Sequence, residues 1–95
     1  MRLRFIYSLR FRVFIMKLYY MPTCPYCQKV LKTFESLKLI EGKDFTLADI
    51  GEEKNHQELL KLGGEDQVPF LVDGKTMMYE SDDIIEYVKK KVNYK

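Results

Sequence analysis

The apolar positions of this chain change their spacing several times, and each change predicts a different element. Short runs rich in aromatic and β-branched residues, bounded by Pro, Gly or Asp, are typical of strands. Longer segments whose apolar side chains recur every three or four residues are typical of helices. We expect strands over residues 17–21, 45–50, 68–72 and 75–79, and helices over 25–39, 52–62 and from 81 onward. This β-α-β-α-β-β-α order predicts an α/β fold in which three helices pack on a four-stranded mixed sheet.

Residues at the ends of these segments support the same division. Pro25 suits the first position of a helix, where its missing N–H costs nothing. Gly63-Gly64 is a natural end for the second helix, and Asp73-Gly74 predicts a hairpin turn. Ser81, which two aspartates follow, is a favourable N-cap for the last helix.

Residues 1–15 differ in character from the rest of the chain. They carry four arginines and no acid, a charge of +4, whereas the remainder carries 12 Lys against 14 Asp and Glu, a charge of −2. Arginines interrupt the apolar run and no small-residue cleavage site follows, so we do not expect a signal peptide. We favour an atypical basic and apolar leader upstream of a true start at Met16, with residues 16–95 as the domain. The alternative is a targeting or membrane-surface role, or a strand, since apolar residues partly alternate.

Length and cysteine content narrow the class of protein. Ninety-five residues suffice for one domain with a modest core. The two cysteines lie too close together to cross-link distant elements, which excludes the disulfide framework of small secreted domains. Such a pair fits a reducing compartment, and we expect a cytoplasmic monomer. The domain has no basic stripe that would favour nucleic acid and no apolar run long enough for a membrane span.

The most informative feature is the segment from Cys24 to Cys27, CPYC, at the junction of a predicted strand and a predicted helix. Cys24 falls at the N-cap, where the amides of Tyr26 and Cys27 can donate hydrogen bonds to a thiolate at the positive end of the helix dipole. Cys27 lies one turn into the helix and lacks these donors. Two thiols at this spacing indicate a redox couple, so we predict that Cys24 attacks a disulfide and Cys27 resolves the mixed disulfide.

Two other interpretations of the cysteines are weaker. The first is a pair of buried and inert thiols. The second is a zinc site, which needs about four ligands, and the only other strong candidate ligand in the chain is His56. We therefore expect no metal, and we interpret His56 as a solvated surface residue.

Three motifs occur in an order and spacing similar to those of the glutaredoxin family: TCPYC at 23–27, QVPF at 67–70 and ESDD at 80–83. The resemblance extends from Met16 to Val92 and implies a thioredoxin-like fold. It also implies a cis peptide between Val68 and Pro69, beside Cys24.

The resemblance further implies how glutathione binds. The backbone of Val68, ahead of Pro69, pairs with the cysteinyl unit, and Ser81 and Asp82 hold the γ-glutamyl end at the start of the last helix. We expect Tyr26 to line the same groove. Glutathione then serves as the reductant, and the partners are disulfide-containing or glutathionylated proteins.

Two departures from the family leave the function open. Glutaredoxins commonly carry Lys three residues before the first cysteine, where this chain has Met21, and Tyr79-Glu80-Ser81 resembles a segment of glutathione transferase N-terminal domains. The leading hypothesis is a glutathione-dependent thiol–disulfide oxidoreductase. The alternatives are a redoxin recycled by thioredoxin reductase, a glutathione-binding module similar to a glutathione transferase N-terminal domain, and a dimeric iron–sulfur carrier. The stiff Pro25 between the cysteines argues against the carrier.

Overall fold

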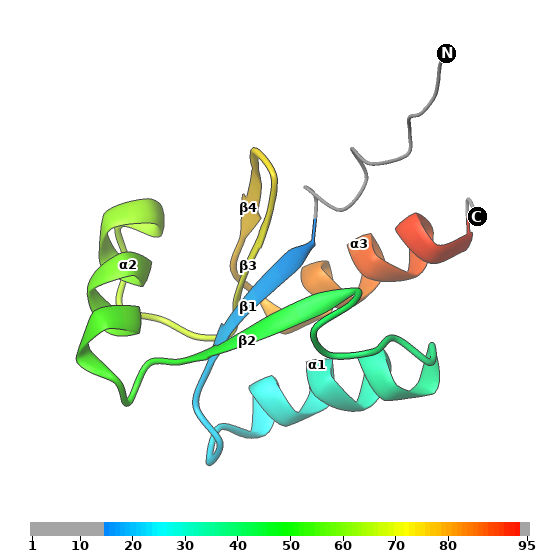
Figure 1. Cartoon of the computed structure of the whole chain (residues 1–95), viewed down its shortest axis with the longest axis horizontal. Coiled ribbons are helices and arrows are strands. Elements are labelled where there is room, and N and C mark those ends of the chain that lie inside the picture. Colours follow the sequence, from blue (N-terminus) through cyan, green and yellow to red (C-terminus); the bar gives the residue numbers. More distant parts are fainter. Residues whose placement is uncertain (1–14, 94–95) are drawn as a thin grey trace.

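Four strands and three helices follow one another in the predicted order in the computed structural model, which describes residues 15–93 (Figure 1). They are β1 (Met16–Tyr20), α1 (Pro25–Ser36), β2 (Phe45–Asp49), α2 (Glu53–Gly63), β3 (Phe70–Asp73), β4 (Thr76–Met78) and α3 (Ser81–Asn93). Residues 1–14, all but the last residue of the expected leader, lie outside the described part.

The strands form one mixed sheet in the order β2-β1-β3-β4. β1 runs parallel to β2 and antiparallel to β3, and β3 pairs with β4 through the hairpin predicted at Asp73-Gly74. Tyr19 of β1 lies opposite Ala48 of β2 on one side and Phe70 of β3 on the other. This arrangement confirms the predicted thioredoxin-like α/β fold.

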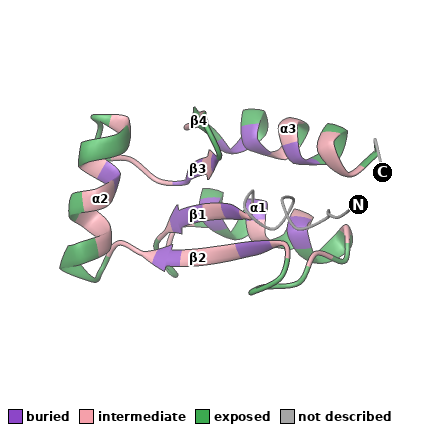
Figure 2. Ribbon diagram, turned by 45° about the horizontal axis from the view of Figure 1, so that its top comes forward, coloured by how far each residue is buried: buried purple, intermediate pink, exposed green. Residues whose placement is uncertain are grey.

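Helices cover both faces of the sheet, and the buried residues gather along the contacts between layers (Figure 2). Because successive side chains of a strand point to opposite faces, Leu18 packs towards α1 and α3 whereas Tyr19 packs towards α2. The larger core consists of Met16, Leu18, Val30, Phe34, Phe45, Leu71, Ile84 and Val88. The smaller core, under α2, consists of Tyr19, Ala48, Leu59 and Phe70.

Several predicted boundaries differ from the structure, and three of the differences have an identifiable cause. α1 ends at Ser36 rather than near residue 39, because Lys38 takes the left-handed conformation, with φ 63°, and turns the chain away from the helix axis. β3 begins at Phe70 rather than Val68, since pairing with β1 starts at Phe70. In α3 the carbonyl of Glu80 accepts the first helical hydrogen bond, from the amide of Ile84, so Ser81 lies just inside the helix.

The β3–β4 hairpin is fastened to α3 by a buried carboxylate. Asp73 Oδ2 accepts a hydrogen bond from the Tyr87 hydroxyl at 2.5 Å and pairs with the Lys91 ammonium at 2.6 Å. Its other oxygen, Oδ1, is buried and has no hydrogen-bond partner among residues 15–93. Burial, together with the hydrogen bond to Asp73, raises the pKa of Tyr87.

Within residues 15–93, no helix has the length and apolar character needed to cross a membrane. The same part of the chain contains no group of three His, Cys, Asp or Glu side chains placed to hold a metal ion.

Candidate functional site

Cys24 occupies the N-cap of α1, as predicted. Its backbone is extended, with φ −85° and ψ 118°, and Pro25 follows within the first turn. The amide of Cys27 donates a hydrogen bond to Cys24 Sγ at 3.2 Å. Of the two expected amide donors, only that of Cys27 makes this bond, and the amide of Tyr26 does not. The helix start therefore presents a donor and the positive end of the α1 dipole to the Cys24 sulfur.

The two thiols lie in different surroundings, although both are free. Cys24 is partly exposed, whereas the Cys27 side chain is completely buried under α1. Burial, with a further contribution from the adjacent Cys24, raises the pKa of the Cys27 thiol to about 12. Cys27 is therefore a neutral thiol at physiological pH, and of the two sulfurs only Cys24 is accessible to a substrate.

A surface cavity of about 400 Å³ lies where the start of α1, the chain before β3 and the start of α3 meet. Its lining residues are Tyr26, Gln67, Val68, Pro69, Glu80, Ser81 and Asp82. All five residues that we expected to bind glutathione are therefore brought together, although Tyr26 precedes Val68 by more than forty residues and Ser81 follows Pro69 by twelve. Neither cysteine lines this cavity, but Tyr26, which stands between them, does.

The cavity wall includes the peptide bond between Val68 and Pro69, which is cis as the resemblance implied. Pro69 is buried and Val68 half-buried, and both lie just before the first paired residue of β3. Val68 thus borders the cavity from outside the regular ladder of the sheet.

The opposite wall is the first turn of α3, where backbone amides meet acidic side chains. Ser81 is buried, Asp82 is exposed, and Glu80 lies directly before them with φ 67°. Free amides at a helix N-terminus attract a carboxylate, and acidic side chains attract an ammonium group. This wall therefore suits a zwitterionic group such as the end of an amino acid.

Two contacts around the cavity were not foreseen from the sequence. Gln67 Nε2 donates to Glu80 Oε2 at 3.4 Å and joins the two walls. Lys29 on the exposed side of α1 forms an ion pair of 2.7 Å with Asp82, so that a cation borders the α3 wall. Gln67 and Glu80 are the first residues of the QVPF and ESDD motifs, and this was the only indication in the sequence that they lie near the site. Lys29 had none, because the contact spans 53 positions.

The position of the usual glutaredoxin lysine is occupied by the exposed Met21. The Met21 carbonyl accepts a hydrogen bond from the amide of Cys24 at 3.1 Å and closes the turn before α1. Met21 thus supports the cysteine loop through its backbone but brings no charge to it.

Comparison with known proteins agrees with this geometry. Residues 18–94 match the family described as glutathione S-transferase, N-terminal domain. The chain belongs to this family. Among curated proteins, no sequence is similar enough to count as a match.

Several glutathione transferases of known structure resemble this N-terminal domain. One from the Antarctic clam Laternula elliptica is 29% identical, with a TM-score of 0.69 over 83% of this chain and 36% of its own. One from Bombyx mori is 30% identical, with a TM-score of 0.64 over 80% of this chain and 35% of its own. A homologue from Drosophila mojavensis with bound glutathione shares the fold, at 24% identity and a TM-score of 0.68 over 83% of this chain and 36% of its own.

The chain thus spans about a third of the length of these transferases. The fold class and the association with the glutathione transferase family follow directly. Membership of the glutaredoxin family, which the three motifs TCPYC, QVPF and ESDD suggested, does not follow from the family match.

Proposed function

We propose that this transferase-type domain binds glutathione in the cavity beside α1 and uses Cys24 for thiol–disulfide exchange. The observation that carries the proposal is the position of a half-exposed cysteine at a helix N-terminus, two residues from Tyr26 on the cavity wall. Family membership and solved transferases support the glutathione part. The CPYC segment, which pairs an accessible thiol with a buried one, supports the exchange part.

In the proposed complex, each wall of the cavity holds one portion of glutathione. The backbone of Val68 pairs with the cysteinyl unit, and the first turn of α3 with Ser81 and Asp82 holds the zwitterionic γ-glutamyl end. Tyr26 lines the groove between this site and Cys24. The glutathione sulfur then points towards Cys24.

The reaction proceeds in two exchanges that balance in sulfur and electrons. The Cys24 thiolate attacks the glutathione sulfur of a mixed disulfide, the substrate thiolate leaves, and Cys24 becomes bonded to glutathione. A second glutathione thiolate attacks that bond, releases oxidised glutathione and restores Cys24. With a protein disulfide, Cys24 attacks one protein sulfur and the other leaves as a thiolate. Cys27 then attacks Cys24 in this mixed disulfide, releases the second protein thiol and forms a Cys24–Cys27 bond, which two glutathione molecules reduce while forming oxidised glutathione. A reducing compartment such as the cytoplasm suits this cycle.

A second candidate function is glutathione binding without turnover, as a recognition module. Membership of a transferase family favours it, and so does the Tyr79-Glu80-Ser81 segment at the start of α3. A third, recycling by thioredoxin reductase, rests on the absence of a lysine at Met21.

The test is glutathione-dependent reduction of a glutathionylated peptide by the wild type, Cys24→Ser and Cys27→Ser, with glutathione binding measured by calorimetry on the same samples. Turnover by the wild type and Cys27→Ser, with none by Cys24→Ser, is the expected result. Binding without turnover in the wild type would favour the recognition module. Turnover with thioredoxin reductase alone, without glutathione binding, would favour the third candidate.

A further inference from the structure

The segment between α2 and β3 brings Val68 to the cavity, and much of it is exposed. Gly64, Glu65 and Asp66 all lie at the surface, and Gly64 ends α2 in the left-handed conformation with φ 86°. A loop with so few buried side chains would move freely unless other contacts held it. We refer to residues 64–68 as the cradle loop.

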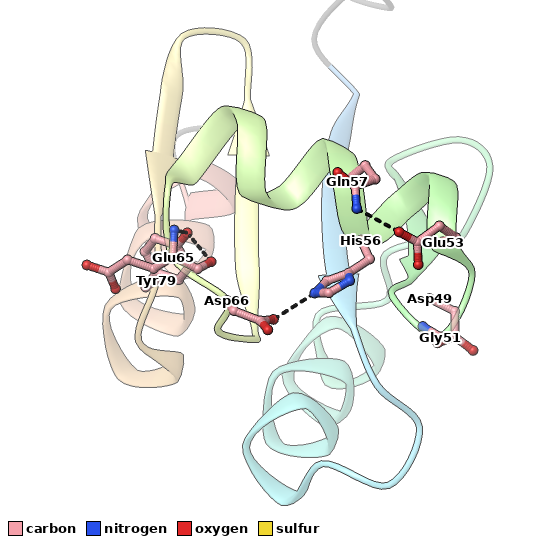
Figure 3. Close-up of polar contacts among 8 residues, drawn as sticks. All are labelled: Asp49, Gly51, Glu53, His56, Gln57, Glu65, Asp66 and Tyr79. Atoms are coloured by element: carbon pink, nitrogen blue, oxygen red, sulfur yellow. Dashed lines mark hydrogen bonds and ion pairs between the residues drawn. The ribbon is translucent and has the colours of Figure 1, made fainter.

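Tyr79 fastens the start of the cradle loop. Its hydroxyl accepts a hydrogen bond from the amide of Glu65 at 3.1 Å and donates one to the carbonyl of Glu65 at 2.9 Å (Figure 3). Its ring packs on Phe70, with the ring centres 4.5 Å apart. A methyl group at Gly63 would collide with the Tyr79 hydroxyl, so glycine permits this close approach.

His56 fastens the middle of the same loop from α2. Its Nε2 lies 2.9 Å from Asp66 Oδ1, and the His56 side chain is only 29% exposed (Figure 3). His56 does lie at the surface, but the expectation of a solvated histidine did not include its contact with Asp66, which approaches the helix from a loop ten residues further along the chain. The loop is thus tied on both sides, by α2 and by the segment after β4.

We propose that Tyr79 is a positioning residue for the glutathione cradle, with His56 as a second tie. This inference rests on the proposed function. Tyr79 immediately precedes Glu80 and Ser81, so this one residue connects the two walls of the cavity. Its backbone leads into the α3 wall, and its hydroxyl fixes the loop that carries Val68. A wall held in place before binding spares the ligand the entropic cost of ordering it, and this raises affinity without any direct contact.

Tyr79→Phe isolates the tie, because it keeps the ring on Phe70 and removes only the hydroxyl. Tyr87→Phe is the matched control, since its hydroxyl also donates to a distant group, Asp73, but away from the cavity. The first readout is native-state hydrogen exchange of the cradle-loop amides, which needs no ligand. We expect Tyr79→Phe to speed their exchange at least about fivefold and Tyr87→Phe to leave it unchanged.

The second readout is steady-state kinetics with glutathione. Loss of two neutral hydrogen bonds from a positioning residue predicts a rise in the glutathione KM of about two- to tenfold, with kcat within about twofold of the wild type. His56→Ala should act in the same direction, and the double variant should raise KM further.

The two readouts separate failure of this inference from failure of the proposed function. Unchanged exchange in Tyr79→Phe, or an equal change in Tyr87→Phe, would overturn the tie. Faster exchange with an unchanged KM would show that the loop is tied but that its position does not matter for binding, which also overturns the inference. A wild type that does not bind glutathione would instead overturn the proposed function, while the exchange data would still report on the tie.

Discussion

The amide of Cys27 donates its hydrogen bond to Cys24 Sγ, while the sulfur of Cys27 itself is sealed beneath the helix. The backbone of Cys27 therefore stabilises the sulfur of Cys24, while the sulfur of Cys27 is buried away from solvent. This difference in access is the reason why Cys24 attacks first and Cys27 second in the proposed exchange.

The first prediction concerns alkylation of each thiol alone, in Cys27→Ser and Cys24→Ser. Burial raises the pKa of the Cys27 thiol from 9.0 to about 12, which lowers its thiolate fraction about a thousandfold, and the same burial blocks the reagent. At neutral pH, Cys24 should react with iodoacetamide at least about a hundredfold faster than Cys27, as followed by intact mass. In denaturant the two rates should converge, and a faster native reaction at Cys27 would contradict the assignment.

The second prediction concerns stability at alkaline pH. The unfolded chain loses the Cys27 proton near pH 9.0, whereas the folded chain keeps it up to about pH 12. The native state therefore binds more protons than the unfolded state between pH 9 and 12. The protonated Cys27 thiol contributes fully to the free energy of unfolding below pH 9, and this contribution is lost as the pH rises towards 12. Urea unfolding under reducing conditions should show a steeper fall above pH 9 for the wild type than for Cys27→Ala. The lysines and tyrosines titrate in both proteins, so equal slopes would contradict the raised pKa.

The third prediction restores the missing cation with Met21→Lys. Met21 is 39% exposed, and an ammonium group on this turn would attract the anionic ligand across solvent. An exposed charge of this kind should lower the glutathione KM by about two- to fivefold, less so at high salt. Met77→Lys is the matched control, since Met77 is similarly exposed at 42% but lies on the edge strand β4 rather than in the turn before Cys24. An equal effect of both variants would point to net charge rather than to position.

The fourth prediction concerns the buried carboxylate of the β3–β4 hairpin. Lys91→Met keeps the aliphatic stem but leaves the Asp73 charge with Tyr87 alone, and it should cost about 1–3 kcal/mol in the free energy of unfolding. Lys90→Met is the control, because Lys90 forms only an exposed pair of 3.5 Å with Glu86, worth about 0.5 kcal/mol. Denaturant titrations of the two variants compare them directly. Similar losses would mean that Lys91 does not neutralise Asp73.

The sequence predicted the order of the elements because each carries its own local signal. The spacing of Val30 and Phe34 marks the buried side of α1, and Gly64 marks the end of α2. The early end of α1 carried no such signal, since a lysine, rather than glycine or asparagine, adopts the left-handed conformation at residue 38.

Part of the candidate site was predictable for a different reason. Tyr26, Val68, Pro69, Ser81 and Asp82 lie in or beside motifs whose resemblance to a known family implies a shared glutathione site. The contacts of Lys29 with Asp82 and of His56 with Asp66 were not predictable, because each depends on how separate segments pack. The interpretation of His56 as a surface residue missed its partner Asp66 for this reason.

The small core under α2 has a thermodynamic consequence. α2 has eleven residues and a single fully buried side chain, Leu59, and a helix of that length is marginal by itself in water. The α1–α3 side has a larger core, so α2 is the unit that we expect to open first in partial unfolding. Its opening would release His56 and the adjoining loop together. The proposed glutathione site would then be lost at a free energy well below that of global unfolding, while α1 with Cys24 stays folded.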